Sequence, residues 1–202
     1  MKAMIFHGYG SSPSKITWLI KPFKEVYKEV EVPKVPAPLT KAWEAFKDSK
    51  ADVYGGHSMG GALALLLSSK FGVPAVAVAP PTDLRAQMEH LKKRIPVIYE
   101  DIMNSVKDPN VLYEHSPINF EYEAPILIIH GTEDDVVPID QSVRFCKKVK
   151  NCDLVIVEGM GHKPSNEREL EFVQSVIKNF LLSVSELREG LEAEQGFEGE
   201  RC

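Results

Sequence analysis

The segment Gly56–Gly60, with the sequence GHSMG, narrows the choice of fold more than any other part of this chain. It follows a short strand-like run and leads directly into the helix-forming stretch Gly61–Leu67. A serine on so sharp a strand-to-helix turn has a strained backbone, and glycines two residues before and after it relieve the crowding. The pattern therefore predicts a nucleophile elbow that holds the Ser58 hydroxyl in open space.

The same five residues fit a plainer interpretation, in which Ser58 only caps a helix after a glycine-rich turn. The rest of the sequence has to decide between the two. Strand-like and helix-like segments alternate along the chain, a pattern that favours βαβ units with helices on both faces of a parallel sheet. The strand-like segments are residues 3–6, 29–32, 51–55, 74–79, 125–129 and 153–157.

These segments predict an α/β fold, a three-layer αβα sandwich around a mostly parallel six-stranded sheet. Most of the strands are continuous apolar runs, as expected for strands buried on both faces. Residues 29–32 alternate polar and apolar side chains instead, which favours a half-exposed strand at the edge of the sheet. Amphipathic spacing predicts helices over 15–27 and near 39–47.

We expect residues 1–185 to form a single domain, because a chain of 202 residues is long enough for one substantial core. The connection over 82–120 is longer than a crossover helix requires, and its apolar residues are spaced among many charges. It is either a helical lid or a plain pair of surface helices. Residues 186–202 are rich in Glu and Gly, so we expect a flexible acidic tail.

Composition excludes several classes of function. The net charge of −5 argues against a nucleic-acid-binding surface. No apolar run is long enough for a membrane span or a signal peptide, so a cytoplasmic protein is expected. The three cysteines, Cys146, Cys152 and Cys202, match no CxxC motif, and we expect them to be free thiols.

Four loops that follow predicted strands carry reactive or flexible residues. The carboxyl ends of parallel strands form the ligand-binding edge of an open α/β sheet, so these loops should converge there. They are His7–Ser12, the turn at Ser58, residues 130–138 with Asp134, and residues 159–164 with His162.

The His7–Ser12 loop lacks the third glycine of a dinucleotide fingerprint and the Lys-Ser/Thr pair of a phosphate-binding loop. It suits an oxyanion loop better. Glycines on both sides of Tyr9 let the backbone turn so that its N–H points toward the same volume as the N–H of Met59. Met59 would begin the elbow helix, where the helix dipole also favours an anion.

Serine, aspartate and histidine thus follow three different strands in the order Ser58, Asp134, His162, which is the chain order of the α/β-hydrolase triad. The sequence from Met1 to about Leu182 resembles a small member of the α/β-hydrolase superfamily. The segment Gly131–Pro138 is similar to the acid-bearing loop of its esterase, dienelactone hydrolase and prolyl oligopeptidase branches. That resemblance, and not the spacing, implies that Asp134 is the catalytic acid.

The resemblance also implies a trimmed sheet, because the first predicted strand corresponds to the third of the usual eight. It implies a serine hydrolase, carboxylesterase-like, that cleaves a small carboxylic ester or thioester through an acyl-enzyme on Ser58. Large, gated oligopeptidase activity is not expected. Three alternatives remain: a non-catalytic binding protein of this fold, an acyltransferase, or a peptidase with the same triad.

Further contacts with the substrate are expected from residues beside the predicted site. His57 precedes the nucleophile and would pack against or line the pocket, and Val136, Met88 and Ile98 would face the acyl group. No His, Asp or Cys cluster has metal-ligand spacing, so we expect neither a metal nor an organic cofactor. The sequence leaves the oligomeric state open.

Overall fold

A computed structural model describes the backbone of residues 1–199 and the side chains of residues 1–196. At its centre lies a six-stranded sheet with the order β2-β1-β3-β4-β5-β6, in which each strand is parallel to its neighbours. The strands are β1 (Lys2–Phe6), β2 (Glu29–Glu31), β3 (Val53–His57), β4 (Ala75–Val78), β5 (Ile126–Gly131) and β6 (Cys152–Val157). The predicted parallel α/β fold is confirmed.

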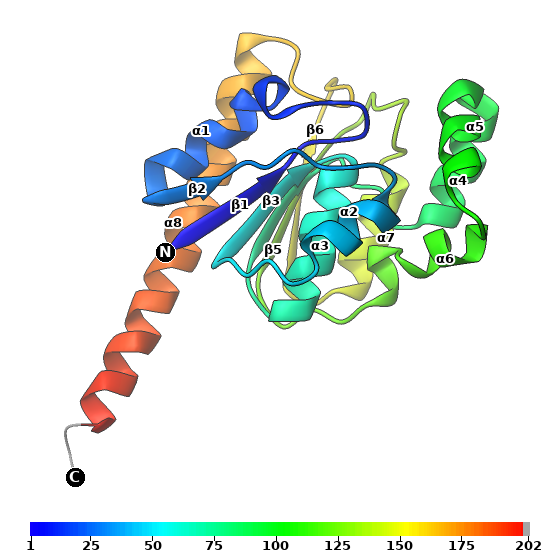
Figure 1. Cartoon of the computed structure of the whole chain (residues 1–202). Helices are drawn as coiled ribbons and strands as arrows, with labels where there is room; N and C mark the ends of the chain where they lie inside the picture. Colours follow the sequence, from blue (N-terminus) through cyan, green and yellow to red (C-terminus); the bar gives the residue numbers. More distant parts are fainter. Residues whose placement is uncertain (200–202) are drawn as a thin grey trace.

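Helices cover both faces of the sheet and make three layers (Figure 1). On one face, α1 (Thr17–Val26) packs against α8 (Glu167–Gly199). The other face carries α2 (Leu39–Phe46), α3 (Met59–Phe71) and α7 (Asp140–Lys148). Each face encloses its own apolar cluster, so the two cores meet only through the sheet.

Burial along the strands follows the sequence pattern. β3, β4 and β5 are buried at every position, as expected of central strands covered on both faces. α3 is apolar all round and is buried over most of its length, which suits a helix enclosed by its neighbours. The short, half-exposed β2 lies at one edge of the described sheet and pairs with β1, as its alternating pattern predicts.

The long connection after β4 is helical. It contains α4 (Leu84–Arg94), α5 (Pro96–Ser105), α6 (Pro109–Glu114) and a 3-10 turn at Pro117–Asn119. α4 buries one side, with Met88 and Leu91 among its covered residues, whereas α5 has no fully buried residue. This helical insertion, α4 to α6, lies beside the carboxyl ends of the strands (Figure 1).

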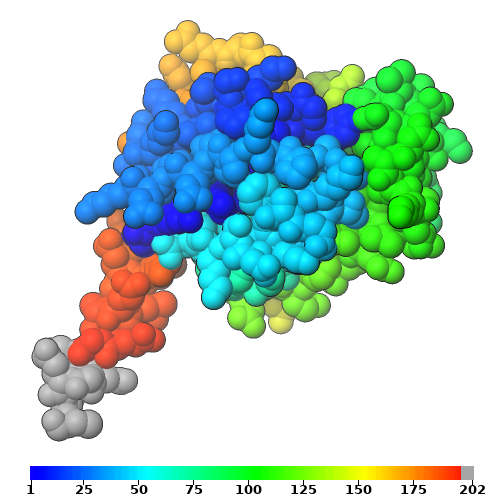
Figure 2. Space-filling view, in the orientation of Figure 1, coloured from blue at the N-terminus to red at the C-terminus, as the bar shows by residue number. Residues whose placement is uncertain are grey.

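The C-terminal segment differs from the sequence expectation. We expected a flexible tail from residue 186, but α8 continues through Gly199. Its extension is held by Arg188, which pairs with Glu192 one turn later and with Asp52 near the start of β3. The last described turns project beyond the rest of the molecule (Figure 2), and residues 200–202 lie outside the described residues.

The expectation of free thiols is wrong for two of the cysteines. Cys146 on α7 and Cys152 at the start of β6 form a disulfide with a Cα–Cα distance of 5.1 Å. The turn between α7 and β6 brings the two backbones into the range that a disulfide needs, which their spacing in sequence does not reveal. Cys202 lies outside the described residues. Among the helices that the structure describes, none combines the length and apolar character that a bilayer crossing requires.

Candidate active site

Ser58 occupies a strained turn between β3 and α3. Its backbone has φ 56° and ψ −124°, a positive-φ conformation that non-glycine residues rarely adopt. The neighbouring glycines make the turn possible: a Cβ on Gly56 would lie 2.0 Å from the carbonyl oxygen of Gly60, and one on Gly60 would lie 2.1 Å from that of Phe6. The backbones approach too closely there for any side chain.

Asp134 and His162 meet although 27 residues separate them in sequence. Their loops follow the adjacent strands β5 and β6. His162 Nδ1 lies 2.8 Å from Asp134 Oδ2, and Asp134 Oδ1 accepts hydrogen bonds from the backbone N–H groups of Val136 and Val137, each at 2.9 Å. Because the ionised carboxylate can only accept, Nδ1 of His162 carries a proton and Nε2 is left free to act as a base.

A second histidine supports the carboxylate of Asp134. His130 is fully buried, and its Nε2 lies 2.8 Å from the Val137 carbonyl oxygen and 3.2 Å from Asp134 Oδ2. Burial alone would raise the pKa of Asp134, but hydrogen bonds from His130 and His162 outweigh it and hold the pKa well below its usual range. Asp134 therefore stays ionised at neutral pH. Its side chain is buried, whereas its neighbours Glu133 and Asp135 are exposed.

His57, the residue before Ser58, lies against His162. Its Nε2 donates a hydrogen bond of 2.8 Å to the backbone carbonyl oxygen of His162, and the two ring centroids are 4.7 Å apart. Burial, followed by repulsion from His162 when that ring is protonated, lowers the pKa of His57 to about 4. The ring is thus neutral at pH 7 and serves as a hydrogen-bond donor.

The loop after β1 packs directly on the elbow. A Cβ on Gly8 would lie 3.2 Å from the Cβ of Ser58. His7 fixes the loop, because its Nε2 accepts a hydrogen bond of 2.9 Å from the Val35 N–H while Nδ1 donates to the carbonyl oxygen of Gly8. Tyr9 follows and lines the pocket that also exposes Ser58 and Met59.

That pocket has a volume of about 240 Å³ and lies between the elbow and the helical insertion. All nine residues predicted from the sequence either line it or act on a residue that does. Ser58, His162, Tyr9, Met59, His57, Val136, Met88 and Ile98 line it, and Asp134 binds His162 from behind. The insertion supplies an apolar wall of Leu84, Met88, Leu91, Ile98, Ile102 and Leu112.

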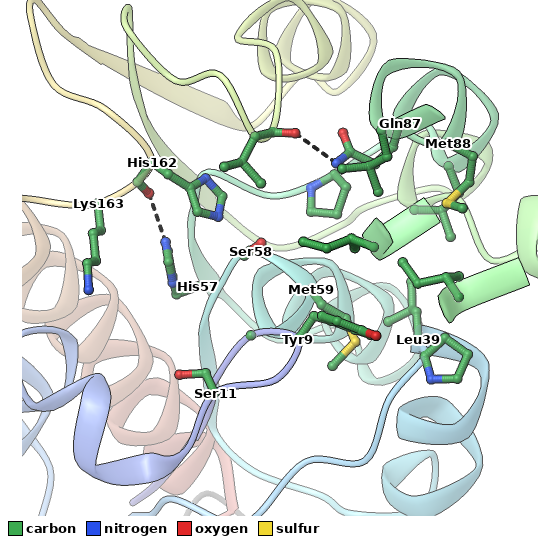
Figure 3. Close-up of a pocket in the computed structure, with 18 of the residues that line it drawn as sticks. Tyr9, Ser11, Leu39, His57, Ser58, Met59, Gln87, Met88, His162 and Lys163 are labelled. Carbon is green, nitrogen blue, oxygen red and sulfur yellow. Dashed lines mark hydrogen bonds between the residues drawn. The ribbon is translucent and has the colours of Figure 1, made fainter. Parts of the chain in front are cut away.

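Ser58 and His162 face one another across the pocket (Figure 3). No hydrogen bond joins the Ser58 hydroxyl to His162 within residues 1–196. Contacts between a nucleophile and its base are often long before substrate binds, and they shorten in the reacting complex.

A polar connection between α4 and the acid-bearing loop was not predicted from the sequence. Gln87 donates from Nε2 to the Val136 carbonyl oxygen at 3.0 Å, and its Oε1 accepts from Gln141 at 2.8 Å. His90 lies one turn later and donates to the Asp135 carbonyl oxygen. The acceptors on the acid-bearing loop are the main-chain carbonyl groups of Val136 and Asp135. Any residue provides such a group, so no pattern of side chains could have indicated these two contacts.

The arrangement can activate a hydroxyl, stabilise an anion and accept an apolar group beside it. A base with one free nitrogen, a buried carboxylate behind it and a serine at a helix N-terminus surround one pocket. In the part of the chain that the structure describes, no group of His, Cys, Asp or Glu is placed to hold a metal ion.

Comparison with known proteins identifies the family of this chain and structures that share its fold. Residues 39–186 match the prolyl oligopeptidase family. The sequence matches none of the curated proteins with which it was compared.

Several solved structures share the fold. Est1E from Butyrivibrio proteoclasticus is 21% identical with a TM-score of 0.63, over 90% of this chain and 86% of that one. The alpha/beta hydrolase domain-containing protein 10 from mouse is 15% identical with a TM-score of 0.69, over 90% of both chains. The monoacylglycerol lipase of Paleococcus ferrophilus is 17% identical with a TM-score of 0.62, over 90% of this chain and 93% of that one.

Proposed function

Since this chain belongs to the prolyl oligopeptidase family and has an α/β-hydrolase fold, we propose that it is a serine hydrolase with Ser58 as nucleophile, His162 as base and Asp134 as acid. The observation that carries the proposal is the 2.8 Å contact between His162 Nδ1 and Asp134 Oδ2, beside the pocket that exposes Ser58. That contact fixes which nitrogen of His162 is free to take a proton.

In the first half of the reaction, the Ser58 hydroxyl attacks the carbonyl carbon of the substrate and His162 Nε2 takes its proton. The imidazolium formed is stabilised by the ionised Asp134. When the tetrahedral intermediate collapses, the bond to the leaving group breaks and His162 returns the proton to that group. An acyl chain remains on Ser58.

The negative charge of the tetrahedral intermediate falls on the former carbonyl oxygen. Backbone N–H groups of Tyr9 and Met59 hold it, since both residues border the pocket beside Ser58 and Met59 begins α3. One such donor typically contributes roughly 10²- to 10³-fold in rate. The bond from Val35 to His7 keeps the first of these loops in place.

In the second half of the reaction, water enters the site in place of the released leaving group. His162 Nε2 removes a proton from the water, the hydroxide attacks the acyl carbon, and Ser58 leaves with that proton. The apolar wall of the insertion suits a carboxylic ester or thioester with a short to medium acyl chain, and the helices over 82–120 serve as a lid over that chain.

The test is hydrolysis of p-nitrophenyl esters, from acetate to dodecanoate, by the wild-type protein and by Ser58→Ala, with fluorophosphonate labelling of both. We expect turnover and labelling in the wild type and neither in Ser58→Ala, which should remain folded by circular dichroism. Labelling without ester turnover would redirect the assignment to acyl transfer or amide cleavage. A folded wild-type protein that is not labelled would favour a binding protein.

A peptidase is the second candidate, favoured by the match of this chain to the prolyl oligopeptidase family. Aminoacyl p-nitroanilides, assayed beside the ester series, separate the two activities. If the amide is cleaved with the higher kcat/KM, the peptidase assignment replaces the esterase one.

A further inference from the structure

The pocket has a charge distribution unlike that of the whole chain. The protein has 29 acidic and 24 basic residues besides histidine. Yet the lining of the pocket includes two lysines, Lys15 and Lys163, and no Asp or Glu among the residues that the structure describes. An electropositive rim on an acidic protein concentrates anions at that point.

Neither lysine has its charge neutralised locally. Lys15 and Lys163 are exposed and form no ion pair within residues 1–196, whereas Lys2, Lys47, Lys70 and Lys178 each contact a carboxylate. Lys15 ends the 3-10 turn that follows the oxyanion loop, and Lys163 follows His162 directly. Both ammonium groups are therefore available to a bound molecule.

Lys163 and the apolar wall lie on different sides of the nucleophile. In Figure 3, Lys163 lies beside His57, while Met88 and Leu39 lie across the pocket beyond Ser58. A substrate centred on Ser58 thus meets an apolar side under the insertion and a cationic side at Lys163.

The proposed reaction determines which part of the substrate lies on each side of the pocket. The leaving group has to take its proton from His162, so it lies on the side of His162, which is also the side of Lys163. The acyl chain then extends the other way, under α4 and α5, among the apolar residues. We propose that the substrate is an ester or thioester of an apolar acid whose leaving group carries a negative charge, bound by Lys15 and Lys163; this rests on the proposed function of Ser58.

Carboxylate and phosphate groups share the chemistry that two ammonium groups bind, since both offer several acceptor oxygens and a full negative charge. A pair of esters with similar leaving groups tests the charge itself: 3-carboxyphenyl butanoate and its neutral analogue 3-carbamoylphenyl butanoate. A third ester, with a phosphate in place of the carboxylate, identifies which of the two anions is preferred.

The measured quantity is the ratio of kcat/KM for the charged ester to that for the neutral one. Because exposed ion pairs contribute modestly, we expect a ratio of roughly 2 to 30 in the wild type. Lys15→Gln with Lys163→Gln should bring it close to one, and Lys15→Arg with Lys163→Arg should preserve it. Raising the salt from about 0.02 to about 0.5 M should also lower it.

Lys21→Gln, an exposed lysine of α1 that does not line the pocket, is the matched control and should leave the ratio unchanged. A wild-type ratio near one, or one that the double Gln variant retains, would overturn the inference while leaving the serine hydrolase intact. Hydrolysis of neither ester by folded protein would overturn the proposed function, and the inference with it.

Discussion

His57 donates a hydrogen bond from Nε2 to the backbone carbonyl oxygen of His162 across 2.8 Å. This contact joins the end of β3 to the loop after β6, two elements separated by β4 and β5 in the sheet. The residue before the proposed nucleophile therefore holds the backbone of the proposed base.

We predict that His57→Ala lowers kcat by about 10- to 100-fold, because loss of the bond lets the His162 loop shift by a fraction of an ångström to an ångström. His57→Gln, which can still donate from a side-chain N–H, should recover part of the loss. Steady-state kinetics check this, with the half-buried His115→Ala, which does not line the pocket, as control. Wild-type kcat in His57→Ala would contradict the positioning role.

The free energy of unfolding should decrease as the pH falls through the range between the unfolded and folded pKa values of His57. Burial lowers its pKa to about 4, below the value of about 6.5 in an unfolded chain. The unfolded state therefore binds more protons between these values, so the contribution of neutral His57 is complete above pH 6.5 and is lost as the pH falls toward 4. Urea unfolding should show a decrease on the order of 2–4 kcal/mol across this window, and a much weaker one in His57→Gln.

Asp134→Asn should lower kcat by about 10⁴-fold, because an amide favours the wrong tautomer of His162. The exposed neighbour Asp135→Asn is the matched control and should retain nearly full activity. Both are checked by ester hydrolysis at pH 7. A comparable loss in the two variants would contradict the assignment of Asp134.

Gly56→Ala should destabilise the protein severely, by roughly 4 kcal/mol or more, because the new Cβ would lie 2.0 Å from the carbonyl oxygen of Gly60. Gly190→Ala is a contrasting change on α8, where nothing lies within 4 Å of the added carbon. It should stabilise the helix by about 0.5–1 kcal/mol. Thermal unfolding measures both, and similar Tm values would refute the crowding argument.

Gln87→Leu should cost about 1–3 kcal/mol for each buried partner left without a hydrogen bond. Those partners are the Val136 carbonyl oxygen and the amide of Gln141. Because Val136 also donates to Asp134, kcat should fall as well. Lys93→Leu, an exposed change on the same helix, provides the comparison for both urea unfolding and kinetics.

Sequence patterns predicted the strands and the turn at Ser58, because these features depend on residues close together in the chain. The apolar runs identified the central strands, the alternation at 29–32 placed β2 at the edge, and the crowding around Gly56 and Gly60 indicated the turn at Ser58. Each of these follows from side chains a few residues apart, so the sequence is sufficient.

Long-range main-chain contacts escaped prediction for a physical reason. His57 and Gln87 bond to carbonyl oxygens 105 and 49 residues away, and every residue offers such an oxygen. The course of α8 past residue 186 depends on the pairing of Arg188 with Asp52, and the disulfide depends on the turn between α7 and β6. Only the folded arrangement specifies these partners.

The direction of α8 has a practical consequence. The helix begins near the carboxyl ends of the strands, where the pocket lies, and continues past their amino ends, where β1 starts (Figure 1). Its 33 residues span about 50 Å at 1.5 Å per residue. Attachment to a solid support through the far turns of α8 would therefore orient the pocket mouth toward the bulk solution, and an immobilised protein should keep full access to dissolved reagents.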